Sequence, residues 1–129
     1  MILDRAKQKD NSQLLEEILD ELIAHTPDIL IALVVSDDGL NVASGIPDDD
    51  DDSIALIASD LVDMAEEFCK RLAQGQLNRI LLEGETRTTV VVNAGSHTIL
   101  AVLVPAQTKL GLIGLSMRRA AGQIASIFG

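Results

Sequence analysis

The sequence contains two histidines, His25 and His97, and a single cysteine, Cys69. Nucleophilic catalysis requires a nucleophile held next to a base. His25 falls near the end of a predicted helix, where a partial positive charge suits the helix dipole, and His97 begins a predicted strand after a turn. Cys69 falls on an apolar helix flank, where a free cysteine usually contributes to packing. We therefore predict structural or surface roles for these side chains and no enzymatic activity.

Five consecutive aspartates, Asp48 to Asp52, are the second feature that could carry chemistry. Their alternation resembles a calcium loop, but an EF-hand requires glycine at the sixth position and glutamate at the twelfth. Ser53 and Ser59 occupy those positions. We expect a solvated loop whose last carboxylates cap and complement the N-terminus of the following helix. A metal or small-molecule sensor at this loop is a lower-ranked alternative, and we predict no cofactor and no metal site.

Two glycines after a lysine, Gly111 and Gly114 after Lys109, could suggest a phosphate-binding loop. The sequence lacks both the P-loop pattern and glycines at dinucleotide-binding spacing. Close packing of the last helix on a sheet is the better explanation. Arg118 and Arg119 then fall on the exposed side of that helix.

The length and charge of the chain limit the possible functions. With 129 residues and 47% apolar residues, we expect one domain with one core. The net charge of −10 disfavours binding to nucleic acids and to anionic membranes. A single cysteine permits no internal disulfide, and the longest apolar run, Ile29 to Val35, is too short to cross a bilayer. We therefore expect a cytoplasmic protein without membrane insertion.

Hydrophobic periodicity predicts the order α-β-β-α-β-β-β-α. Two of the strands are apolar throughout, which is typical of strands buried on both faces. We expect an α/β fold (an α+β sandwich) with a five-stranded, mainly antiparallel sheet and helices on both faces. Asn11 or Ser12 should cap the first helix, and Gly75 the long one. The predicted elements are 13–26, 29–35, 40–44, 53–74, 77–83, 86–93, 97–104 and 110–128.

The long helix predicted over residues 53–74 has two adjacent apolar groups. Together they span about half of the helix circumference, which is wider than one contact with a sheet requires. We expect the bulky group to pack on the sheet. The bulky group contains Ile54, Ile57, Leu61, Met64, Phe68 and Leu72. The small group contains Ala55, Ala58, Val62, Cys69 and Ala73.

The small group would let another backbone approach closely, either from a neighbouring loop or helix of the same chain or from a second copy. The strand over 77–83 favours the second interpretation, because its apolar residues lie at a predicted sheet edge, where they need a partner. Pairing two such strands would form a two-fold homodimer. The predicted dimer interface contains Ala55, Ala58, Val62, Cys69, Ala73, Ile80, Leu81 and Leu82.

Over about residues 13–128, the sequence resembles the Roadblock (dynein light chain) family, including its bacterial and archaeal small-GTPase regulators. No single motif carries the resemblance, which rests on the order of all the matching segments. These segments are Leu22 through the Pro27-Asp28-Ile29 break, the hairpin 34–40, the helix entry 53–58, and the closing stretches 99–103, 110–113 and 117–120.

The resemblance implies a homodimer with a continuous ten-stranded sheet that regulates or scaffolds Ras-like small GTPases docked over the paired long helices. It suggests that the partner binds the outer helix face at Leu56, Asp63, Glu67 and Lys70. Leu56 could equally be an ordinary exposed leucine. We expect a polar tail over residues 1–11 and a single Roadblock-like domain over 12–129, which prefers the GTP form of its partner. A structural scaffold of a larger complex, without nucleotide sensitivity, is the alternative.

Overall fold

A sheet of five antiparallel strands lies at the centre of the protein. The structure is a computed structural model that describes residues 10–128. The predicted element order and fold class are confirmed. The elements are α2 (Asn11–His25), β1 (Ile31–Ser36), β2 (Asn41–Ser44), α3 (Asp51–Arg71), β3 (Arg79–Glu83), β4 (Arg87–Asn93), β5 (Thr98–Pro105) and α4 (Leu110–Phe128).

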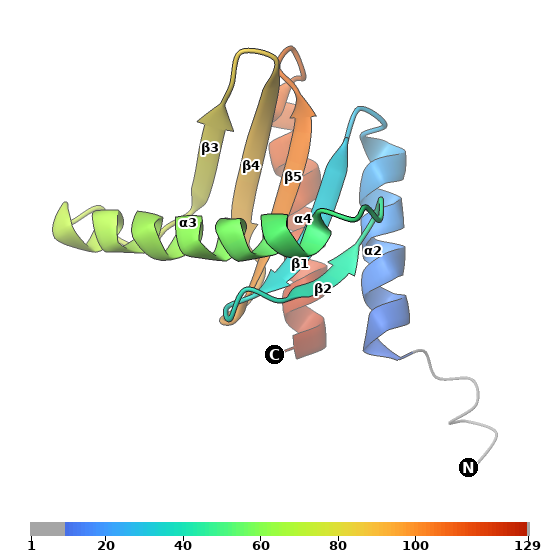
Figure 1. Ribbon diagram of the computed structural model, residues 1–129, viewed down its shortest axis with the longest axis horizontal. Helices are drawn as coiled ribbons and strands as arrows, with labels where there is room; N and C mark the ends of the chain where they lie inside the picture. Colours follow the sequence, from blue (N-terminus) through green and yellow to red (C-terminus); the bar gives the residue numbers. More distant parts are fainter. Residues whose placement is uncertain (1–9, 129) are drawn as a thin grey trace.

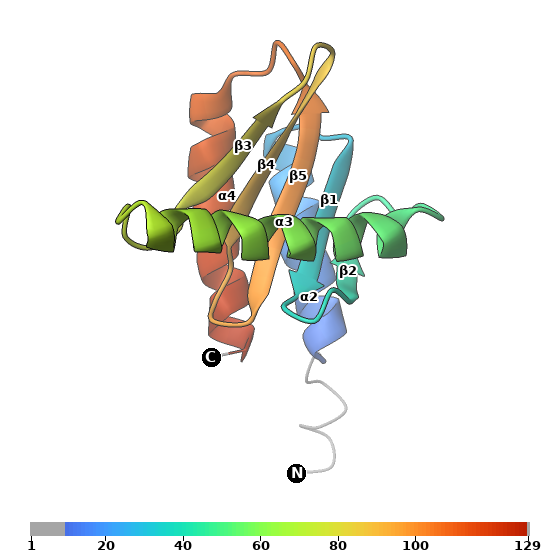
Figure 2. The same cartoon turned by 60° about the vertical axis from the view of Figure 1, so that its left-hand side comes forward.

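The strands are arranged in the order β2-β1-β5-β4-β3, so β2 and β3 form the two edges. The predicted hairpin β1–β2 and the predicted meander β3–β4–β5 are both present. Helices α2 and α4 lie side by side on one face of the sheet, and α3 crosses the other face at a steep angle to the strands (Figure 1). The view in Figure 2 shows the same three layers.

Two hydrophobic clusters, one on each face of the sheet, form the core. Alternate residues of β1 supply both clusters: Ala32 and Val34 pack towards α2 and α4, while Leu33 and Val35 pack towards α3. This alternation confirms that β1 is buried on both faces, as its continuous apolar run predicts.

The N-terminus of α2 differs from the prediction at its cap. Asp10, and not Asn11 or Ser12, is the N-cap residue. Its carboxylate accepts a 2.8 Å hydrogen bond from the backbone N–H of Gln13, and the Gln13 side chain accepts one from the backbone N–H of Asp10. This reciprocal capping box satisfies two N–H groups that the helix leaves free, which is why it is favoured over a single serine cap. The predicted tail over 1–11 falls largely on residues outside the described part of the chain.

The C-terminus of α3 also differs from the prediction. Gly75 does not cap the helix, which ends with Leu72 as its C-cap. Ala73 follows in the left-handed region with φ 53°, and the N–H of Gln74 donates a 2.8 Å hydrogen bond to the oxygen of Cys69. This is the hydrogen-bond pattern of a Schellman motif, with alanine at the position that usually holds glycine.

The face of α3 that packs on the sheet is not the one we predicted but the adjacent face of small residues. Its small residues Ala55, Ala58 and Val62 pack against the sheet and are almost fully buried. Most of the bulky group predicted to pack there is exposed instead. The sheet residues on this side have mostly large side chains. A helix face of small side chains can therefore approach the sheet closely and fill the space between them. The sheet residues of this cluster are Leu33, Val35, Val91, Ile99 and Ala101.

Candidate functional site

The exposed side of α3 carries a row of large apolar side chains. At about 100° per residue, they form one stripe along a flank of the helix, next to the face that packs on the sheet. Met64 and Phe68 are 62% and 67% exposed, which is unusual for such side chains in a single folded chain. We name this row the α3 stripe. It contains Ile57, Leu61, Met64, Phe68 and Leu72.

The outer edge of β3 is the second unpartnered feature. Because β3 ends the sheet, only one of its edges pairs with a neighbouring strand. Ile80 lies opposite Val91 and packs on the α3 side of the sheet, while Leu81 lies opposite Val90 and faces the α4 side. Leu81 and Leu82 are 41% and 50% exposed. An apolar strand with a free edge is prone to pairing with another strand.

Helix α3 leaves part of its own sheet face uncovered. Beside the helix lies a shallow hollow of about 230 Å³. Its walls are almost entirely apolar and come from β1, β4, β5 and the start of α3. The hollow is lined by Ile31, Leu33, Ile54, Thr89, Ala101, Val102 and Leu103. The α3 stripe, the β3 edge and this hollow together form an extended apolar surface around one edge of the molecule.

The structure separates the eight predicted dimer residues into two groups. Ala55, Ala58 and Val62 lie beneath α3 and contact the chain's own sheet, so they are inaccessible to a second copy. Neither interpretation of the small group, a loop or helix of the same chain or a second copy, included this contact with the sheet. The remaining residues are half-buried or exposed along the C-terminal part of α3 and on β3, and stay candidates for the interface. They are Cys69, Ala73, Ile80, Leu81 and Leu82.

The predicted partner-binding residues all lie on the surface of α3, along the flank that faces away from the hollow. Leu56 is 54% exposed, and Asp63, Glu67 and Lys70 follow further along the helix surface. Glu67 accepts a 2.8 Å hydrogen bond from Nε of Arg71 on the next turn. The flank therefore carries acidic and basic side chains together with one apolar side chain. This composition suits a partner surface that is also partly charged and partly apolar.

The aspartate run is arranged around the N-terminus of α3. Asp51 is buried, and its Oδ2 accepts a 3.0 Å hydrogen bond from the backbone N–H of Asp48, whereas its Oδ1 has no partner. Asp51 and Asp52 lie in the first turn, where negative charge complements the helix dipole. The N-cap residue Asp50 makes no capping hydrogen bond. No group of three potential ligands within residues 10–128 could hold a metal ion.

Sequence reasoning does not identify the partner of His97. Its Nδ1 lies 2.7 Å from Oδ2 of Asp37, and the pair joins the β1–β2 turn to the β4–β5 turn. Sixty positions separate the two residues, so only the fold reveals their contact. Both side chains are mostly exposed. The pair holds two turns together, and no hydroxyl or thiol within residues 10–128 hydrogen-bonds to either side chain of the pair.

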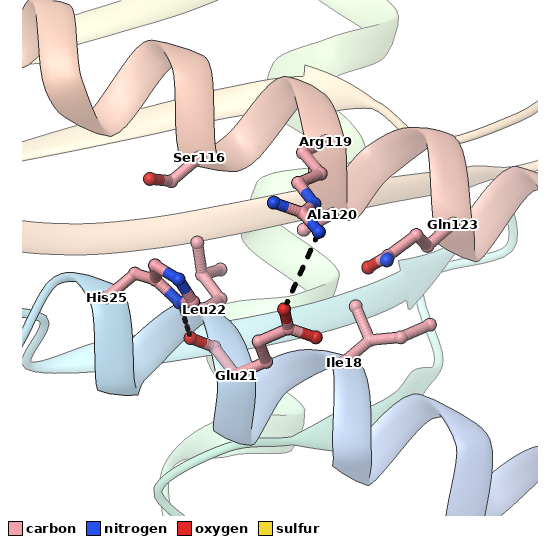
Figure 3. A pocket seen from close by; sticks show the side chains of 8 residues that line it. All are labelled: Ile18, Glu21, Leu22, His25, Ser116, Arg119, Ala120 and Gln123. Atoms are coloured by element: carbon pink, nitrogen blue, oxygen red, sulfur yellow. Dashed lines mark hydrogen bonds and ion pairs between the residues drawn. The ribbon is translucent and has the colours of Figure 1, made fainter.

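The groove between α2 and α4 contains several polar side chains (Figure 3). Arg119 Nη2 lies 3.9 Å from Oε1 of Glu21, and Nδ1 of His25 lies 2.8 Å from the backbone oxygen of Glu21. The groove holds only about 60 Å³. That volume admits a few water molecules but no larger ligand. As predicted, Arg118 and Arg119 lie on the exposed side of α4.

Comparisons with known proteins agree with this architecture. The family model described as the Roadblock/LC7 domain matches residues 15–104. Two uncharacterized proteins of Methanocaldococcus jannaschii, MJ0310 and MJ1340, are each 36% identical over 116 residues, which covers 89% of this chain and all of each relative.

Among solved structures, the gliding protein MglB from Thermus thermophilus superposes with a TM-score of 0.82 at 21% identity, covering 93% of this chain and 92% of that one. A Roadblock/LC7 domain from Streptomyces avermitilis gives 0.82 at 24% identity, covering 88% and 96%. An MglB with a tetrameric arrangement gives 0.83 at 22% identity, covering 93% and 91%. At these identities the structures show a shared fold. No helix within residues 10–128 is long and apolar enough to cross a membrane.

Proposed function

The chain belongs to the Roadblock/LC7 domain family, and we propose that it is a homodimeric, non-catalytic regulator or adaptor that binds a Ras-like small GTPase in its GTP form. The observation that carries this proposal is the continuous apolar surface formed by the α3 stripe, the β3 edge and the hollow beside α3. A chain with this surface needs a partner of matching shape.

A second copy of the chain matches the β3 edge. Two antiparallel β3 strands would supply each other's missing backbone hydrogen bonds and join two sheets into one of ten strands. Leu82 and Ile80 would then lie near the two-fold axis on the α3 side, and Leu81 on the opposite side. The Roadblock resemblance implies the same arrangement.

The length of α3 supports the same dimer. A helix of 21 residues is about 31 Å long, whereas five strands spaced about 4.8 Å apart span about 19 Å. Helix α3 packs mainly on β1 and β2, and its C-terminal end extends past β3 (Figures 1 and 2). In the dimer, that end would lie over the hollow of the partner's sheet. Met64, Phe68 and Leu72 would be buried there, each stabilising the dimer by about 1.5–3 kcal/mol.

The GTPase would bind across the two α3 helices. The flank that carries Leu56, Asp63, Glu67 and Lys70 lies away from the hollow, so dimer formation would leave it accessible. Family resemblance suggests this docking surface. A preference for the GTP form requires contacts that differ between the two nucleotide states of the partner.

A pull-down from a lysate of the source organism tests this function. The purified protein is the bait, once with a non-hydrolysable GTP analogue and once with GDP. We expect a small GTPase to be enriched only with the analogue, and to be lost when Asp63 and Glu67 are both replaced by lysine. The control is Glu16→Lys with Asp20→Lys, which makes the same change in charge at the same spacing on α2, on the opposite face of the molecule. Equal recovery of another protein in both nucleotide states, without a GTPase, would instead support a plain scaffold.

A further inference from the structure

A groove between the sheet and α4 brings together two arginines without any acidic neighbour. Arg79 is the first residue of β3 and Arg118 lies on α4. The groove has a volume of about 670 Å³, and the amide side chains of Asn78 and Asn93 also line it. No aspartate or glutamate of the described chain is part of its lining. The groove lies on the face of the sheet opposite α3, so it is separate from the proposed GTPase-binding surface.

The Arg79 side chain reaches the stretch of α4 that carries Arg118. A Cβ atom added to Gly114 would be 3.1 Å from Nη1 of Arg79, so the Arg79 side chain lies directly against the helix there. Arg118 follows Gly114 by one helical turn, which puts it on the same side of α4. Within residues 10–128, neither arginine makes an ion pair or a hydrogen bond to a side chain or backbone oxygen. Both positive charges are available to a ligand.

Small residues keep the groove open along the next turns of α4. Ala121, Gly122 and Ala125 form its floor, and nothing lies within 4 Å of a Cβ atom added to Gly122. The side chain of Asn93 is fixed in place because its Nδ2 donates a 2.9 Å hydrogen bond to the oxygen of Leu77. The site thus combines a fixed amide, two unpaired cations and free space.

We propose that this groove binds the phosphate group of a small phosphorylated molecule, with Arg79 and Arg118 as the residues that neutralise its charge. Guanidinium groups bind phosphate oxygens through paired N–H donors. The volume falls in the range of about 300–1000 Å³ that is typical of small-molecule sites. The net charge of −10 would repel a long polyanion such as nucleic acid, which favours a small ligand.

Backbone amide NMR titrations of the full chain test the proposal with three probes: inorganic phosphate, adenosine 5′-monophosphate and a hexaglutamate peptide. We expect saturable shifts at Arg79, Gly114, Arg118 and Gly122 with the nucleotide. Saturation by inorganic phosphate at a similar concentration would identify free phosphate as the ligand. Tighter binding of hexaglutamate at the same residues would show that the groove accepts a protein segment, and would overturn the proposal. The absence of saturable shifts up to about 10 mM of each phosphate probe would also overturn it.

Variants with matched controls separate the groove from general charge effects. Arg79→Ala and Arg118→Ala should each weaken phosphate binding by about tenfold or more, since each removes a charge-assisted contact. Arg119→Ala removes the same charge from the groove between α2 and α4, and should leave the affinity for phosphate unchanged. Gly122→Leu should fill the site and abolish binding without loss of stability, because leucine favours the helix. Gly111→Leu, also unhindered, is its control. If Arg119→Ala weakened binding as much as Arg118→Ala did, the groove would not be the site.

Discussion

Ser59 Oγ donates a 3.1 Å hydrogen bond to the backbone oxygen of Asp37, and so ties α3 to the turn between β1 and β2. Ser59 is buried in the row of small residues beneath the helix. The bond holds the N-terminal half of α3 over β1 and β2, while the C-terminal end of the helix extends past β3 (Figures 1 and 2) and its large side chains are exposed. This attachment determines which part of α3 is available to a second chain.

Replacing Ser59 by alanine should destabilise the fold by about 1 kcal/mol, because the buried hydroxyl then no longer satisfies the oxygen of Asp37. Urea unfolding at a fixed protein concentration measures the change. Ser126→Ala is the control: its hydroxyl bonds to the oxygen of Gly122 on the exposed side of α4, and its loss should cost less. Equal effects of the two substitutions would show that the Ser59 bond does not hold α3 in place.

Gly39 should be sensitive to alanine, since its φ of +84° lies in the left-handed region. A Cβ atom there would lie 2.8 Å from Cδ1 of Leu56, but this methyl group ends an exposed side chain that can move. We therefore expect Gly39→Ala to destabilise the fold by about 1–2 kcal/mol, mainly from backbone strain. Gly75→Ala, with φ +83° and nothing within 4 Å of the added atom, should cost about the same. Thermal unfolding of both variants checks this, and a much larger loss for Gly39→Ala would show that the Leu56 side chain cannot move aside.

Ala73→Gly should stabilise the protein by about 0.5–1 kcal/mol. Ala73 adopts φ 53° after the C-cap of α3, where glycine avoids the strain imposed by a Cβ atom. The free energy gained by removing this strain exceeds the free-energy cost of the additional chain entropy that glycine brings to the unfolded state. The measurement is the urea midpoint at constant protein concentration. A lower midpoint would indicate that the methyl group of Ala73 makes a contact, for example in a dimer, that outweighs the strain.

Most of the fold could be predicted from the sequence, because the apolar runs of β1 and β5 and the turn residues between elements indicate the strands, the hairpin and the meander. The pairing of β1 with β5 and the orientation of α3 could not. Bulky residues such as Phe68 and small ones such as Ala58 lie on adjacent sides of the helix, and hydrophobicity alone favours burying the bulky side. The sheet already supplies bulk at Leu33 and Val35, which makes the small side the better fit.

The candidate interface residues on β3 could be predicted from the sequence, whereas several of those on α3 could not, because they depend on the orientation of the helix. The local pattern of an apolar edge is enough to identify the strand residues Leu81 and Leu82. Val62, by contrast, is predicted at the dimer interface and is instead part of the core, so Val62→Glu would unfold the chain rather than separate two copies. The spacing of four, three and four residues from Ile57 to Phe68 is typical of helix–helix contacts, and is the sequence signal for the exposed stripe.

The mass of the protein in solution shows whether two copies join through β3 and α3. Sedimentation equilibrium at micromolar concentration should give twice the 13.8 kDa of one chain. Phe68→Asp should give folded monomers, because a charge would be buried without a partner in the dimer while its site is exposed in the monomer. Leu115→Asp, at an equally exposed site on α4, should remain dimeric. A monomeric wild type, or a Phe68→Asp variant that stays dimeric, would contradict the proposed interface.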